Sequence, residues 1–108
     1  MNELQKEIEK IEDEQRDALR EFDKQFDEIQ NYKHQLHKDN EKKYAIFHEL
    51  QQRDANLLHY QHAFERVVDE ATFEFEQKLK DIERQLFIER DALIQSYQRE
   101  IRQLELRG

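Results

Sequence analysis

The sequence lacks the residues that most often interrupt or cross-link a chain. None of its 108 residues is proline, and its single glycine is Gly108. Because proline and glycine are the strongest helix breakers, no position inside the chain obliges the backbone to leave a helix. Cysteine is absent as well, which excludes disulfides, thiolate nucleophiles and zinc–thiolate sites.

Long apolar segments and an excess of positive charge are also missing. No apolar run approaches the roughly 18 residues that a membrane-spanning helix needs, and no basic segment followed by an apolar one marks a cleaved signal peptide. The 26 acidic and 18 basic side chains give a formal net charge of −8, which repels phosphate groups. We therefore expect a cytoplasmic protein that neither inserts into membranes nor binds nucleic acid. Co-export with a partner, without a cleaved signal peptide, is the alternative.

The residues that are present are typical of long helices. Charged residues make up 41% of the chain and apolar residues 36%, a composition of solvent-exposed helices and coiled coils rather than of globular domains. Such a chain has enough apolar side chains for one seam between helices, but not for a large core.

Apolar residues recur three or four positions apart in both halves, which is the spacing of one face of a helix. In the first half they are Leu4, Ile8, Ile11, Ala18, Phe22, Phe26, Ile29 and Leu36. In the second half they are Leu57, Phe64, Val68, Ala71, Phe75, Leu79, Ile82, Leu86, Leu93, Tyr97 and Leu104. Asn2 is a candidate N-cap for the first helix, and Asp54 or Asn56 for the second.

The two apolar series mirror each other about Asp54. Reflection produces the apolar pairs Phe22–Leu86, Phe26–Ile82 and Tyr44–Phe64, and it brings Leu36 to within one position of Ala71, its predicted partner. We therefore predict an all-α fold: an antiparallel two-helix hairpin of coiled-coil type, forming one domain over residues 1–108. Its helices are expected at about 3–52 and 57–106, with a turn at about 53–56. The polar segment 37–43 offers an alternative turn at Asp39–Asn40, but that turn leaves the C-terminal part of the apolar stripe without a partner.

A second apolar stripe distinguishes the second half. Its members Phe73, Phe87, Ile94 and Ile101 recur at multiples of seven, one position away from the seam, and Ile88 adds apolar surface beside them. Since neighbouring positions are turned by about 100° around a helix, one antiparallel helix does not cover both the seam and this stripe. The stripe therefore predicts a surface that binds another chain. The alternative is a wide seam covered by the stems of Lys and Arg side chains.

The sequence contains no pattern typical of a catalytic or metal site. His34 and His37 lie three apart, as do His59 and His62, but no Glu-x-x-His occurs to complete a metal site between helices. Neither a glycine-rich phosphate loop nor a Gly-x-Ser-x-Gly motif is present. Acid–base catalysis needs carboxylates held in a desolvated pocket, which a pair of helices does not provide. We expect a protein that is not an enzyme and that binds no cofactor or metal.

Three segments carry a resemblance to a known family. They are Glu14-Gln15-Arg16, the aromatic-rich centre with Tyr44, Phe47, Tyr60 and Phe64, and residues 90–99 (RDALIQSYQR). With them, nearly the whole chain resembles the small helical proteins encoded beside LXG-domain toxins in Gram-positive type VII secretion systems. Those proteins are similar to the WXG-type (Esx-like) helical hairpins.

The chain also departs from that family's patterns. It has no Trp-x-Gly turn, and Tyr97 is followed four positions later by Ile101 where the export pattern Tyr-x-x-x-Asp/Glu has an acidic residue. The segment from Phe87 to Asp91 is similar to a Phe-x-x-x-Asp pattern of a companion class of proteins in these systems. The departures count against direct recognition by the secretion machinery, but they do not affect a role as toxin partner.

The resemblance implies a non-enzymatic adaptor, or targeting chaperone, that binds and stabilises the helical N-terminal domain of an LXG-type toxin for type VII secretion. A second small helical protein is a further expected partner, and a homodimer is an alternative. The alternative function is a self-assembling coiled-coil structural or scaffold protein. The stripe and the Phe-x-x-x-Asp pattern predict the partner-binding residues Phe73, Phe87, Ile88, Asp91, Ile94 and Ile101.

Overall fold

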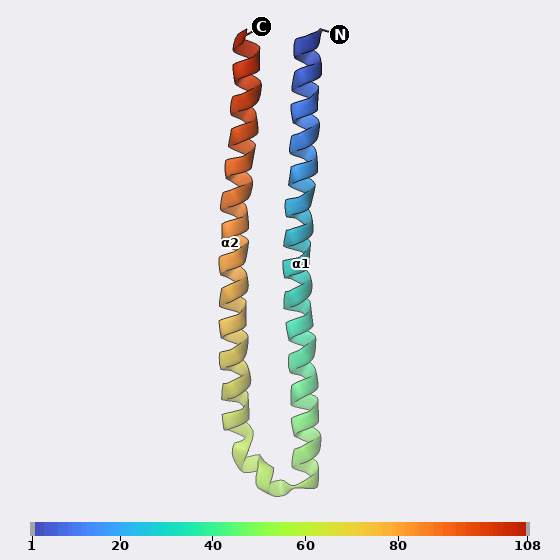
Figure 1. Ribbon diagram of the computed structural model, residues 1–108. Coiled ribbons are helices and arrows are strands. Elements are labelled where there is room, and N and C mark those ends of the chain that lie inside the picture. Colours follow the sequence, from blue (N-terminus) through green and yellow to red (C-terminus); the bar gives the residue numbers. More distant parts are fainter. Residues whose placement is uncertain (1, 108) are drawn as a thin grey trace. The chain divides into compact units, whose positions relative to one another are not determined.

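Two long helices account for nearly all of the chain. The computed structural model describes residues 2–107, which form α1 (Glu3–Arg53), the short 3₁₀ helix η1 (Ala55–Tyr60) and α2 (Gln61–Arg107) (Figure 1). Among these residues no strand occurs. The predicted all-α class, with one long helix in each half of the sequence, is confirmed.

Helix α1 begins with the predicted N-cap. The backbone N–H of Gln5 donates to Oδ1 of Asn2 at 2.8 Å, and the N–H of Lys6 donates to the carbonyl oxygen of Asn2 at 3.2 Å. The first amides of a helix have no partner within the helix, so this side chain satisfies one of them. The start of the helix is therefore determined by a local interaction.

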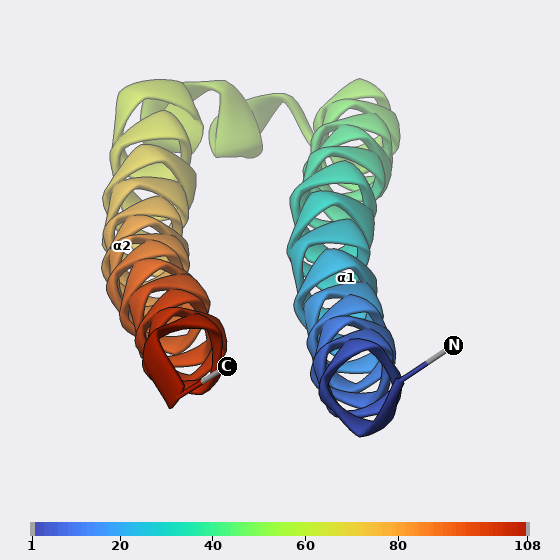
Figure 2. The ribbon, with the colours of Figure 1, turned by 90° about the horizontal axis from the view of Figure 1, so that it is seen from above.

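The chain leaves α1 at Asp54 without any residue of positive φ among those the structure describes. Asp54 adopts an extended conformation, with φ −137° and ψ 103°, and its Oδ1 accepts from the N–H of Asn56 at 3.0 Å. It thereby caps η1, which crosses from α1 to α2 (Figure 2). Residues 57–60, assigned to the second α-helix from the sequence, belong to this 3₁₀ helix. Because an extended capping residue makes the bend, the connection requires no glycine.

The alternative turn at Asn40 does not occur, since α1 continues through that residue. Asn40 instead faces α2, where its Nδ2 donates to Oγ1 of Thr72 at 2.7 Å. The polar stretch of the sequence around residue 40 thus marks a hydrogen bond in the seam.

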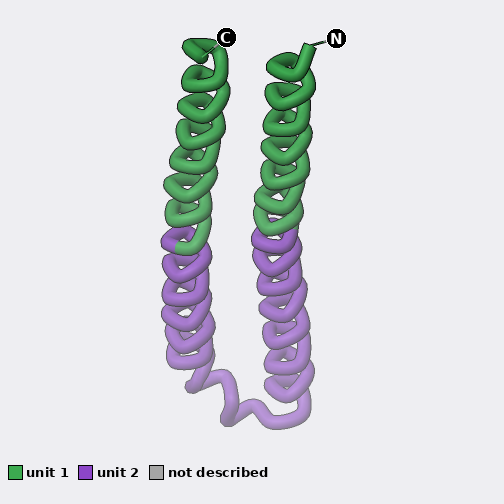
Figure 3. The backbone as a smooth tube through the Cα atoms, turned by 45° about the horizontal axis from the view of Figure 1, so that its top comes forward, with its two compact units in different colours: residues 1–27, 82–108 green, residues 28–81 purple. Residues whose placement is uncertain are grey.

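The helices divide into two compact units (Figure 3). Unit 1 comprises residues 1–27 and 82–108, and unit 2 comprises residues 28–81, including η1. Within each unit a segment of α1 lies beside an antiparallel segment of α2 (Figures 1 and 2).

The register of unit 2 is given by polar contacts at two levels. Asn40 contacts Thr72, and the Nε2 of Gln51 donates to Oε1 of Gln61 at 2.5 Å. Both pairs place residue n opposite residue 112 − n, a shift of four residues from the mirror about Asp54. Four residues are close to one helical turn, so the shift leaves the same faces in contact.

The aromatic contacts of unit 2 show the effect of this shift. The predicted pair Tyr44–Phe64 is confirmed, with ring centroids 5.4 Å apart and edge-to-face geometry, and Phe47 stacks on Phe64 at 4.1 Å. The predicted pair Leu36–Ala71 does not lie in the seam, because Ala71 is exposed and its neighbour Thr72 faces α1.

Unit 2 contains every buried side chain of the described residues. Ile29, Val68 and Leu79 are the buried apolar residues, and Gln51 is buried with its amide hydrogen-bonded to Gln61. The core of unit 2 is small, but these side chains are shielded from water.

Candidate interaction surfaces

Unit 1 has an apolar seam in which none of the described residues, 2–27 and 82–107, is buried. The half-buried apolar side chains are Leu4, Ile8, Ile11, Ala18, Leu19, Phe22, Phe26, Leu86, Leu93, Ile94, Tyr97, Ile101 and Leu104. Two helices in contact shield a seam from one direction each and leave both of its edges open to water. The described part of unit 1 is therefore a helix pair without a finished core.

The aromatic contact of unit 1 joins Phe26 to Phe87, with ring centroids 4.6 Å apart and the rings tilted by 38°. The sequence predicted Ile82 as the partner of Phe26, but Ile82 is exposed. The partner lies five positions further along α2 because the register is displaced from the mirror about Asp54. One member of the predicted stripe thus contacts α1, although Phe87 remains 49% exposed.

The predicted partner-binding residues fall into three groups. Ile94 and Ile101 are half-buried and lie seven and fourteen positions after Phe87, on the same side of α2. Ile88 and Asp91 belong to unit 1 but are exposed and point further from the seam. Phe73 is exposed and belongs to unit 2.

One side of unit 1 is accordingly apolar. Leu19 lies seven residues before Phe26, so both face the same side of α1, which is the side on which Phe26 meets Phe87. We call this surface the Phe87 face. It consists of Leu19, Phe26, Phe87, Ile94 and Ile101.

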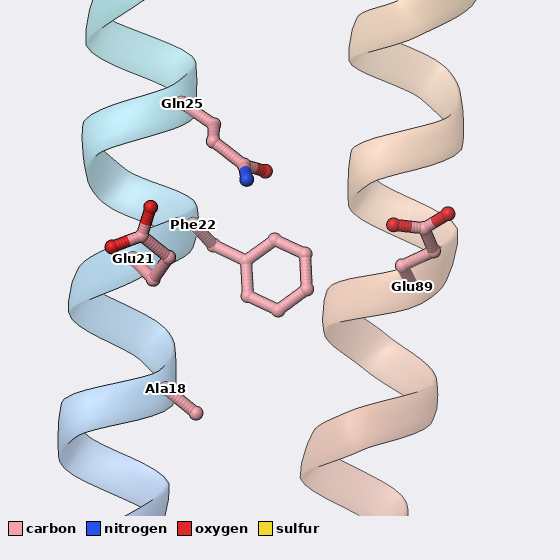
Figure 4. Close-up of a pocket in the computed structure, with 5 residues that line it drawn as sticks. All are labelled: Ala18, Glu21, Phe22, Gln25 and Glu89. Atoms are coloured by element: carbon pink, nitrogen blue, oxygen red, sulfur yellow. The ribbon is translucent and has the colours of Figure 1, made fainter.

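The opposite side of unit 1 is polar. Glu89 lies two positions after Phe87, about 200° around α2. It borders a depression of about 310 Å³ lined by Ala18, Glu21, Phe22, Gln25 and Glu89 (Figure 4). Phe22 points from α1 toward α2 in this depression, and the two carboxylates lie at its edges. The depression has acidic borders and no basic residue.

A polar side of unit 2 surrounds Tyr44. Burial, followed by the negative charges of Asp69 and Glu65 and by a hydrogen bond with Asp69, raises the pKa of Tyr44 above its ordinary value. His37 pairs with Glu41 on α1, at 3.2 Å between Nε2 and Oε1. Polar and charged groups cover this side.

The other side of unit 2 carries exposed apolar residues on both helices. Ile46 lies two positions after Tyr44 and Val67 two positions before Asp69, so each points about 200° away from the polar side. Ile46 is 59% exposed and Val67 65% exposed. We call this surface the Ile46 face. It consists of Tyr32, Leu36, Ile46, Leu50, Val67, Ala71 and Phe75.

The Ile46 face was not predicted from the sequence, because the prediction followed a single seam through the first helix. The detectable signal was a second series that shares Leu36 with that seam and otherwise lies beside it. Tyr32, Leu36, Ile46 and Leu50 are separated by four, ten and four residues, which keeps them on one side of a helix.

Metal sites and membrane-spanning segments are both absent from the described residues, 2–107. No group of three or more His, Cys, Asp or Glu side chains is placed to hold a metal ion there. In the same range, neither long helix has a segment apolar enough to cross a lipid bilayer.

Comparison with models of known protein families, with curated proteins and with solved structures finds no match. The function is therefore inferred from the two apolar faces themselves.

Proposed function

We propose that this protein is a non-enzymatic adaptor whose Phe87 face binds a helix of another protein, the helical N-terminal domain of an LXG-type toxin. One observation carries the proposal: no described side chain of unit 1 is buried, although an apolar seam runs through the unit. A third helix laid along the Phe87 face would bury these side chains from the open edge. At about 25 cal/mol per Å² of apolar surface, such burial favours association.

The chemistry of the partner helix follows from the charge of unit 1. Its 10 basic and 15 acidic side chains give a formal charge of −5. A helix with an apolar stripe flanked by Lys or Arg complements this surface, because opposite charges across an interface speed encounter and disfavour acidic competitors. In this mode of recognition, apolar side chains on one face of the partner helix pack against the apolar surface.

The resemblance of the sequence to WXG/Esx-like toxin partners supports the choice of a toxin's helical domain. A helical partner domain matches a binding face that runs along two helical segments. Stabilisation of the toxin domain and its delivery to type VII secretion are the roles proposed for the complex.

Co-purification with the helical N-terminal domain of an LXG-type toxin from the same genome tests this function. The wild-type chain should retain the domain, and Phe87→Asp should lose it while the circular dichroism of the helices persists. Leu106→Asp is the matched control, since Leu106 also lies in the α2 segment of unit 1 but is 82% exposed and outside the Phe87 face. Retention by the Phe87→Asp chain, or no retention by the wild type, would contradict the proposal.

A further inference from the structure

We propose that unit 2 carries a self-association surface: its Ile46 face packs against the same face of a second copy of this chain in an antiparallel, two-fold arrangement. This inference does not rest on the proposed function, which uses unit 1. In a two-fold interface the same patch occurs on both copies, so the patch must be complementary to itself. The residues of the Ile46 face meet this condition on both helices.

On α1 the face is complementary to itself about residue 41. Reversing the helix about that point places Tyr32 against Leu50 of a second copy, and Leu36 against Ile46. Tyr32, Ile46 and Leu50 are exposed and Leu36 is half-buried, so all four have surface left to bury. Every position of this stripe outside the centre would thus meet an apolar residue.

On α2 the face is complementary to itself about Ala71. Reversal about that residue places Val67 against Phe75 of a second copy and Ala71 against itself. Val67, Ala71 and Phe75 are all exposed. A small side chain at the centre permits close approach of the two helices, with larger residues on either side.

The two centres lie at the same level of unit 2. The Asn40–Thr72 and Gln51–Gln61 hydrogen bonds place residue n opposite residue 112 − n, so residue 41 of α1 lies opposite Ala71 of α2. A single two-fold axis therefore satisfies both helices at once.

Charge agrees with the same register. Asp39 and Lys43 lie on the α1 side of the Ile46 face, at equal distances from residue 41. The reversal that pairs the apolar residues places Asp39 against Lys43 of the second copy, twice per dimer. In a chain of net charge −8, the centre of this face meets a second copy through opposite charges.

The face is large enough for a reversible dimer. From Tyr32 to Leu50, α1 extends about 27 Å at 1.5 Å per residue. Two helices about 9 Å apart make a surface roughly 20 Å wide. On α2 the face extends only about 12 Å, from Val67 to Phe75. The footprint is then on the order of 400 Å² per copy, or about 800 Å² in total, the size of a weak, reversible interface.

Sedimentation velocity of the full chain over a range of concentrations tests the surface. The wild type should shift from monomer to dimer as concentration rises, and Ile46→Glu and Val67→Glu should each remain monomeric with unchanged helicity. Phe73→Glu is the matched control, because Phe73 is an exposed apolar residue of the same unit that lies four positions after Asp69, on the polar side. A wild-type chain that stays monomeric, or a dimer that survives Ile46→Glu, would overturn the proposal.

A charge exchange tests the register. Asp39→Lys alone should weaken dimerisation, because it brings two lysines together at each of two places; Lys43→Asp alone should do the same. The double variant Asp39→Lys/Lys43→Asp should restore the wild-type dimer. If the double variant dimerises no better than the single variants, the antiparallel register is wrong.

Cysteine cross-linking locates the two-fold axis. The chain has no cysteine, so Ala71→Cys introduces a single thiol at the proposed centre. Two such thiols across the axis should form an intermolecular disulfide, which requires Cα atoms roughly 4.4–6.8 Å apart. Ala63→Cys, also exposed in unit 2 but away from the centre, is the control. Equal cross-linking of both variants would contradict the position of the axis.

Discussion

Asn40 and Thr72 join α1 to α2 inside unit 2 through a hydrogen bond of 2.7 Å from Nδ2 to Oγ1. A polar pair in an otherwise apolar seam favours the register in which both groups are satisfied, because sliding the helices would leave a part-buried amide without its partner.

We expect single substitutions of this pair to cost more than the double substitution. Thr72→Val leaves the Asn40 amide unpaired and should lower the free energy of unfolding by about 1 kcal/mol, as should Asn40→Leu. The double variant replaces both polar groups by apolar ones and should recover most of that loss. Urea unfolding of the four chains measures the coupling; additive losses would show that the hydrogen bond does not stabilise the seam.

The buried apolar core of unit 2 should dominate its stability. Ile29 and Leu79 are 4% and 5% exposed. Truncating either to alanine should cost about 2–4 kcal/mol, through lost apolar burial and the cavity left behind. Leu106→Ala should change the free energy of unfolding by less than about 0.5 kcal/mol, because that side chain is largely in water already. Similar losses at buried and exposed positions would contradict the assigned core.

The cap at Asp54 should determine how well η1 forms. Its carboxylate accepts from the N–H of Asn56, so Asp54→Ala removes a partner from a free amide and should cost about 1 kcal/mol. Asp54→Asn keeps an acceptor oxygen and should cost less. Thermal unfolding of both variants provides the comparison, and equal losses would exclude a role for the hydrogen bond.

Tyr44 should make unit 2 sensitive to alkaline pH. Its pKa is raised in the folded chain by burial and by the neighbouring carboxylates of Asp69 and Glu65. A raised pKa favours the neutral phenol in the folded state; its contribution is complete below the unfolded value near 10 and is lost as pH rises through the folded pKa. Tyr44→Phe should lose less stability than the wild type between about pH 8 and pH 11. Parallel stability curves for the two chains over this range would contradict the assignment.

Local patterns in the sequence were sufficient to predict the helices and their caps. With neither proline nor internal glycine, the apolar spacing identified two long helices, and Asn2 caps α1 as predicted. Asp54, one of the two candidates for the cap of the second helix, caps η1 instead. The pair Tyr44–Phe64 was also recovered, since a register error of about one helical turn leaves the same faces together.

Finer pairing could not be predicted, because it depends on the length of the connection. A 3₁₀ helix occupies residues 55–60, which moves the mirror centre away from Asp54 and gives Phe26 the partner Phe87 in place of Ile82. The same displacement brings Phe87, a member of the predicted binding stripe on α2, into contact with α1. The Ile46 face escaped notice because periodicity alone does not show which edge of a wide seam stays uncovered.

The central claim is that the helix pair of unit 1 is incomplete and obtains its missing helix from a partner. Amide hydrogen exchange of the free chain and of its complex with the toxin's helical domain tests this claim most directly, because exchange reports local opening. Residues 3–27 and 82–107 should exchange faster than residues 28–81 in the free chain, and binding should slow exchange mainly in those two segments. Slowing confined to residues 28–81 would contradict the claim.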